Sequence, residues 1–151
     1  MKLAEALMQR SDYQTKLEKI KFRVSNNVKV QEGEEVHEDP TALLAEMEEV
    51  YKHMEDLIKR INHTNNVTDL EPGLTLSAAL TQRDILAKRR SAFDSILYES
   101  SMRQNRVSRS EIKYVTTVDV PALQRRVEQI SKDFRQLETK IQAANWLVDL
   151  I

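Results

Sequence analysis

Hydrophobic residues recur every three to four positions through four long stretches of the chain, and this period is typical of amphipathic α-helices. The first predicted helix begins at Leu3 and ends near 25–27, where serine and asparagine side chains compete for backbone hydrogen bonds. The second begins at Asp39-Pro40, an N-cap residue followed by proline at the first helical position, and ends within the polar stretch 62–66.

The next polar break, 71–73, has the sequence Glu-Pro-Gly and predicts a turn, because proline fixes φ and glycine supplies a positive φ. A third helix follows it, capped by Thr75 or Ser77, and ends near Ser100-Ser101.

The fourth predicted helix starts at Pro121 and keeps a four-three spacing of hydrophobic positions over nearly four heptads. These positions are Leu123, Val127, Ile130, Phe134, Leu137, Ile141, Ala144 and Val148. A sustained repeat of 3.5 residues predicts left-handed supercoiled packing, as in a helical bundle or a coiled coil.

In two of the connecting segments, the pattern of residues alternates with a period of two instead. Residues 112–120 are mostly β-branched or aromatic and predict a strand, and 28–31 is its expected partner because a lone strand leaves backbone groups unpaired. The sequence therefore predicts an all-α fold: an elongated bundle of about four long helices with coiled-coil-like packing, and a small two-stranded β-ribbon formed by the connecting segments.

The composition of the chain limits the classes of protein to which it can belong. The chain has 151 residues, which predicts a single helical domain over 1–151, and its 23 basic and 24 acidic residues leave a formal charge of −1. It has no cysteine, which excludes disulfides, thiolate metal sites and a cysteine nucleophile. The early charges at Lys2 and Glu5 do not fit a signal peptide, and no apolar run reaches the roughly 18 residues of a membrane span, so we expect a cytoplasmic protein.

Several strings of residues carry a family resemblance. They are 30–35 with 38–40, 61–65, 74–80 with 83–84, the Ser-Arg-Ser-Glu-Ile-Lys of 108–113, and 141–146, which ends in Gln-Ala-Ala-Asn-Trp. Together they resemble a bacterial family of short uncharacterised proteins, some of which are labelled septicolysin. That label implies a cytolytic toxin, but a thiol-dependent toxin needs a thiol and this sequence has none.

Metal binding and catalysis find little support. Acidic residues crowd 32–39, and Glu34 with His37 matches half of a di-iron helical motif, but His53 and His63 lack a glutamate three positions earlier. We interpret the cluster as a solvated acidic connector that draws divalent cations only weakly and adventitiously, so no metal-ligating residue is predicted. There is no nucleophile elbow, and two glycines cannot build a phosphate-binding loop, so no catalytic or cofactor-binding residue is predicted.

The segment 103–113 is basic. Its cations are Arg103, Arg106, Arg109 and Lys113. They are suited to weak, salt-dependent binding of nucleic-acid phosphates. A second interpretation needs no ligand: the acidic connector 32–39 attracts this segment, within one chain or between subunits. The chain's nearly balanced charge favours the second.

Arg83 and Arg90 occupy positions of the third helix's hydrophobic stripe. A buried arginine needs a polar partner, and we expect a glutamate or an asparagine of a facing helix, such as Asn62 or Asn65. Asp84 is the next residue in the helix and is expected to point elsewhere. The alternative places both guanidinium groups in water at the edge of the stripe.

The chain ends in an apolar stretch, 146–151, which begins with Trp146 and is interrupted only by Asp149. Either another subunit covers it or it docks on the helix ends of its own chain. We therefore predict a non-catalytic, cytoplasmic helical protein that self-associates as a homodimer or a larger ring. The alternatives, in order, are a nucleic-acid-binding accessory protein using 103–113, an enzyme whose site is not visible in the sequence, and a cytolysin.

Overall fold

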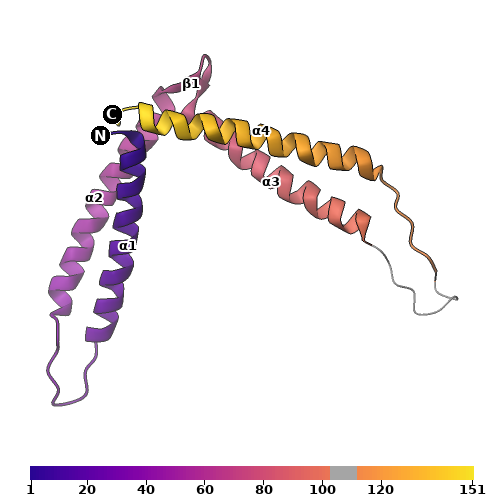
Figure 1. The fold of residues 1–151 in the computed structure, drawn as a ribbon. Helices are drawn as coiled ribbons and strands as arrows, with labels where there is room; N and C mark the ends of the chain where they lie inside the picture. The colour runs from indigo at the N-terminus through magenta and orange to yellow at the C-terminus, as the bar shows by residue number, and fades with distance from the viewer. Residues whose placement is uncertain (103–111) are drawn as a thin grey trace. The chain divides into compact units, whose positions relative to one another are not determined.

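The computed structural model describes residues 1–102 and 112–151 (Figure 1). These residues form four long helices and one small antiparallel ribbon, which confirms the predicted fold class. The elements are α1 (Leu3–Asn27), α2 (Pro40–Val67), β1 (Asp69–Glu71), β2 (Leu74–Thr75), α3 (Leu76–Ser101) and α4 (Val120–Leu147).

The helix boundaries follow the local signals closely. Asp39 caps α2 by accepting a hydrogen bond from the Thr41 backbone N–H at 2.9 Å, and Pro40 occupies the first helical position. The helix continues to Val67, just beyond the predicted end at 62–66. Thr64 explains the extension, because its side chain is fully buried and its hydroxyl donates to the Arg60 carbonyl at 2.9 Å.

The position of the ribbon differs from the prediction. Pairing of 28–31 with 112–120 is wrong, because in the described parts of the chain neither segment forms a strand. The ribbon is instead a hairpin of β1 and β2, closed by a turn in which Gly73 has a φ of +80°. A local hairpin closes a short loop, whereas the predicted pairing has to close a long one at a greater entropic cost.

The chain divides into two compact units. Unit 1 comprises Met1–Leu76 and Gln142–Ile151, and unit 2 comprises Ser77–Ile141. That all 151 residues fold as one domain stays a prediction.

In unit 1, α1 and α2 lie side by side (Figure 1) and bury an aliphatic seam. One cluster of buried side chains lies near the chain ends and comprises Leu3, Ala6, Leu57, Ile61, Leu76 and Leu150. A second cluster lies further along the helix pair and comprises Leu17, Ile20, Leu43 and Val50. The members on α1 are Leu3, Ala6, Leu17 and Ile20, and they follow the three-to-four-residue period that predicted this helix.

In unit 2, α3 and α4 run next to each other (Figure 1). Of the residues described in this unit, the buried hydrophobic side chains are Ala79, Ile130 and Ile141. Two arginine–phenylalanine contacts also lie between these helices. The Arg90 guanidinium lies 4.6 Å from the centre of the Phe134 ring, and Arg126 lies 4.6 Å from the ring of Phe93. Coiled-coil packing of α4 stays a prediction.

Candidate interaction surface

The two ends of the described chain are joined by a short backbone ladder, here called the terminal clasp and comprising residues 1–3 and 147–151. The Leu3 N–H donates to the Val148 carbonyl, and the Leu150 N–H donates to the Met1 carbonyl, both at 2.9 Å. The last residue is also held by a hydrogen bond, which the Ile151 N–H donates to the Thr64 hydroxyl at 3.0 Å. The clasp therefore fixes the end of α4 against α1 and α2.

Lys2 reinforces the terminal clasp. Its Nζ donates to the Leu147 carbonyl at 2.9 Å, at the carbonyl-rich end of α4, and lies 2.9 Å from Asp149 Oδ1. The hydrogen bond from Lys2 holds the pKa of the Asp149 carboxyl below its ordinary value. Both groups are well exposed, so this ion pair orients the chain end more than it stabilises it.

The terminal clasp covers part of the apolar chain end 146–151. Leu150 is buried and Val148 is partly buried, both in the core of their own chain. Trp146 is 56% exposed, however, and Leu147 is 74% exposed. Packing on its own chain therefore buries part of this stretch, whereas Trp146 stays on the surface.

Trp146 borders an open groove of about 300 Å³, here called the docking groove. Its lining residues come from α1 and the last part of α4: Ala4, Leu7, Met8, Ser11, Gln142, Asn145 and Trp146. None of the seven carries a charge, although 31% of the chain's residues are charged. Uncharged, partly apolar patches with tryptophan and methionine are typical of the cores of protein interfaces.

Asn145 is the buried polar member of the docking groove. The residue is 8% exposed, but its amide is not a buried polar atom without a hydrogen-bond partner; in the described part of the chain, that atom is Nε of Arg10.

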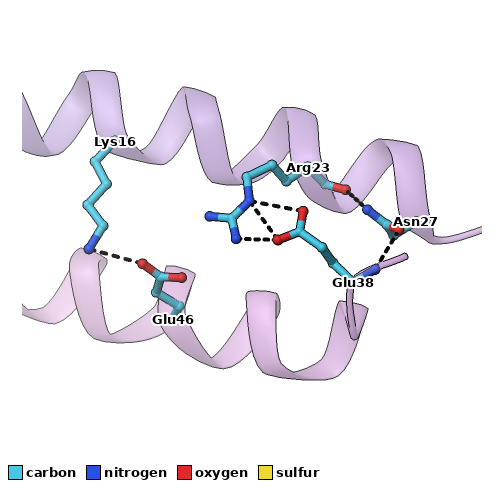
Figure 2. A network of polar contacts seen from close by, with 5 residues as sticks. All are labelled: Lys16, Arg23, Asn27, Glu38 and Glu46. Carbon is cyan, nitrogen blue, oxygen red and sulfur yellow. Dashed lines mark hydrogen bonds and ion pairs between the residues drawn. The ribbon is translucent and has the colours of Figure 1, made fainter. Parts of the chain in front are cut away.

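The acidic connector 32–39 ends in a structural network rather than a chemical site. Figure 2 shows the Arg23 guanidinium of α1 facing the carboxylate of Glu38, with which it forms an ion pair. Asn27 completes the network, because its Oδ1 accepts from the Glu38 N–H at 3.1 Å and its amide donates to the Arg23 carbonyl at 2.8 Å. The hydrogen bond from Arg23 lowers the pKa of Glu38.

The rest of the connector shows no arrangement for metal chemistry. Among the residues that the structure describes, no group of three or more potential metal ligands converges on one point. The same part of the chain holds no helix that is long and apolar enough to span a membrane.

The two stripe arginines are partly buried, and their partners differ from those expected. Arg83 pairs with Asp84 at 2.8 Å and with Glu138 of α4 at 3.4 Å. A facing glutamate was anticipated, but the expectation that Asp84 points elsewhere is wrong, because the long arginine side chain folds back to its neighbour. Arg90 contacts the Phe134 ring.

The asparagines proposed as buried partners do not take that role. Asn62 is exposed and Asn65 is only partly buried. Thr64 is the buried polar residue at this end of α2. Its hydroxyl donates to the Arg60 carbonyl and accepts from the Ile151 N–H.

Most of the basic segment 103–113 lies outside the described residues. Arg103, Arg106 and Arg109 lie outside the described residues, and Lys113 is exposed. Attraction between this segment and the acidic connector stays a prediction, although the strand pairing that suggested it is wrong.

Comparison with known proteins gives a family. Residues 10–150 match the family of unknown function DUF6847. The chain belongs to this family. A comparison with curated proteins finds no match. The chain is also similar to a solved structure described as a functionally unknown conserved protein from Corynebacterium diphtheriae, with 40% identity and a TM-score of 0.93 over 100% of this chain and 99% of that one.

Membership of DUF6847 confirms the predicted resemblance to an uncharacterised family. The septicolysin label finds no support, since neither description mentions it or any cytolytic activity.

Sequence reasoning identified Trp146 but missed Asn145 and the α1 side of the docking groove. A signal was present on α1, where Ala4, Met8 and Ser11 follow a four-three spacing beside the main stripe. No comparable signal marks Asn145, which lies beside residues of α1 that are far away in the sequence.

Proposed function

We propose that this protein is a non-catalytic, cytoplasmic interaction protein that associates with copies of itself. The observation that carries the proposal is the uncharged docking groove with the half-exposed Trp146 on its rim. In a chain so rich in charge, a tryptophan left in water beside an apolar groove is best explained by a protein partner.

The polar side chains of unit 1 support the same proposal. The hydrogen bonds and ion pairs of Arg23, Glu38 and Asn27 connect α1 to the connector that precedes α2, and those of Lys2 and Thr64 hold the terminal clasp. These groups stabilise the fold, and their arrangement suggests no nucleophile, base or oxyanion-binding group.

Size-exclusion chromatography with light scattering and absorbance tests the proposal. We expect a mass that is a multiple of 17.6 kDa, with no excess absorbance from nucleic acid. A monomer at every accessible concentration would contradict self-association. Nucleic acid that co-purifies and is removed by salt would instead favour a binding role for the basic segment 103–113.

A further inference from the structure

We infer that α2 of one copy docks on α3 of a second copy, and that Glu48 of the first copy pairs with Arg89 of the second. This inference rests on the proposed self-association. It goes beyond it by assigning a contact between two different surfaces, both separate from the docking groove, and the pair of opposite charges that joins them.

The two units of the chain carry opposite charge. Unit 1 has 16 acidic and 10 basic residues, which give a formal charge of −6 with histidine neutral. Unit 2 has 13 basic and 8 acidic residues, a formal charge of +5, of which the described residues supply three. Unit 1 of one copy therefore repels unit 1 of another copy and attracts its unit 2. Contact between unlike units is favoured over contact between like units.

In unit 2, an open groove of about 340 Å³ lies along α3 and is here called the α3 groove. Its lining residues are Thr81, Gln82, Ile85, Leu86 and Arg89. Ile85 is 50% exposed, and Ala92 and Ile96 continue the four-three spacing that Ile85 and Arg89 begin. Arg89 is exposed and forms no ion pair among the described contacts. An exposed stripe with this spacing is the kind of surface on which a second helix packs.

In unit 1, α2 carries a matching face beside its contact with α1. Leu44 and Tyr51 are each 48% exposed, and Glu48 lies between them on the same side of the helix. Glu48 is exposed and forms no ion pair among the described contacts. The spacing, four residues and then three, is that of the α3 stripe around Arg89, but the central charge is opposite.

Pairing of Glu48 with Arg89 brings the apolar residues of both helices together. Leu44 and Tyr51 lie about one helical turn from Glu48, as Ile85 and Ala92 do from Arg89. Whichever way the two helices run, an apolar residue of α2 therefore faces one of α3 on each side of the ion pair. Burial of these neighbours excludes water from the ion pair and strengthens it.

The same features favour a second copy over a nucleic acid at the α3 groove. A phosphate could bind Arg89 but gains nothing from the exposed Ile85 beside it. The face of α2 around Glu48 offers both the opposite charge and apolar side chains at the required spacing.

Exchange of the two charges tests the contact on the full chain. Arg89→Glu and Glu48→Arg each set like charges against each other between copies, so we expect each variant alone to associate about tenfold more weakly or worse. An equimolar mixture of the two variants should associate again, because position 48 of each chain then faces the opposite charge at position 89 of the other. Analytical ultracentrifugation measures the dissociation constants, and circular dichroism checks that the helices are retained.

The matched controls make the same changes of charge elsewhere in the same units. Arg125→Glu replaces an exposed arginine of α4, and Glu18→Arg replaces an exposed glutamate of α1. We expect each to change the dissociation constant by no more than about twofold, because neither position lies in the proposed contact.

The apolar part of the contact is tested by Ile85→Ala. We expect it to weaken association about fivefold, because the buried area between the copies falls. The unfolding of dilute, dissociated protein should hardly change, since half of this side chain is already in water. A side chain with a purely structural role would show the reverse.

The outcomes separate the assigned contact from the proposed self-association. A wild-type monomer at every accessible concentration overturns both. A wild-type oligomer overturns only the assigned contact if Arg89→Glu and Glu48→Arg associate normally, if the controls weaken association equally, or if the mixture of the two variants fails to associate. Loss of association in each variant alone and its recovery in the mixture support the pairing of α2 with α3.

Discussion

The helix pairs of units 1 and 2 have similar lengths but different seams. Between α1 and α2, aliphatic side chains such as Ile20 and Val50 are almost fully buried. Between α3 and α4, guanidinium groups lie over phenylalanine rings. Arg90 and both rings are only partly buried, and Arg126 is exposed.

This difference shows that helices with the same spacing of hydrophobic positions can pack through two kinds of contact. Aliphatic groups interlock closely and exclude water, so each buried side chain contributes strongly to stability. Arginine keeps part of its head group hydrated and packs its stem and guanidinium plane on an aromatic ring. We therefore expect the seam of unit 1 to be sensitive to truncation and that of unit 2 to be more tolerant.

The largest expected effect is in unit 1. Ile61 is 2% exposed in the cluster near the terminal clasp, so Ile61→Ala leaves a cavity and should lower the free energy of unfolding by about 3 kcal/mol. The same substitution at Ile85, which is 50% exposed on α3, should change it by less than about 0.5 kcal/mol. Urea denaturation followed by circular dichroism measures both values. Equal losses would contradict the burial of Ile61 in the seam of unit 1.

An intermediate effect is expected for the Arg90–Phe134 contact in unit 2. A double-mutant cycle with Arg90→Met and Phe134→Leu should give a coupling free energy of about 0.5–1 kcal/mol, because the guanidinium retains part of its hydration. The control cycle pairs Phe134→Leu with Arg125→Met, an exposed arginine of α4 that is more than two helical turns away. A coupling no larger than in the control would mean that the ring contact contributes nothing.

The smallest expected effect concerns the acidic connector of unit 1. Because Arg23 lowers the pKa of Glu38 in the folded state, their contact stabilises the protein fully above the unfolded pKa of about 4.3. That contribution is lost as the pH falls through the folded pKa. Glu38→Gln should therefore lower Tm slightly at pH 7, with a difference from wild type that shrinks in acid.

Glu34→Gln provides the control for this experiment, because Glu34 is exposed in the same connector and has no ion pair among the described contacts. Thermal melts of the three proteins between about pH 7 and pH 3 give the comparison. A Glu38→Gln difference that persists unchanged in acid would contradict the assigned role of the Arg23–Glu38 pair.

Much of the fold was predictable because its signals are local. Asp39 and Pro40 start α2, Pro121 stands at the second position of α4, and the Glu-Pro-Gly sequence closes the turn of the hairpin. The candidate site was only half predictable. Trp146 was identified from its apolar neighbourhood, whereas the wrong pairing of 28–31 with 112–120 came from matching two β-prone segments whose partners are not specified locally.

The sequence by itself determined the helices, their hydrophobic stripes and the fold class, because caps, turns and a 3.6-residue period act over a few positions. Only the tertiary structure decided that the chain ends meet, that Thr64 holds Ile151, and that Asn145 is buried in an uncharged groove. These features depend on contacts between residues far apart in the chain. The burial and hydrogen bonding of such residues follow from which surfaces meet, and local residue patterns do not encode that.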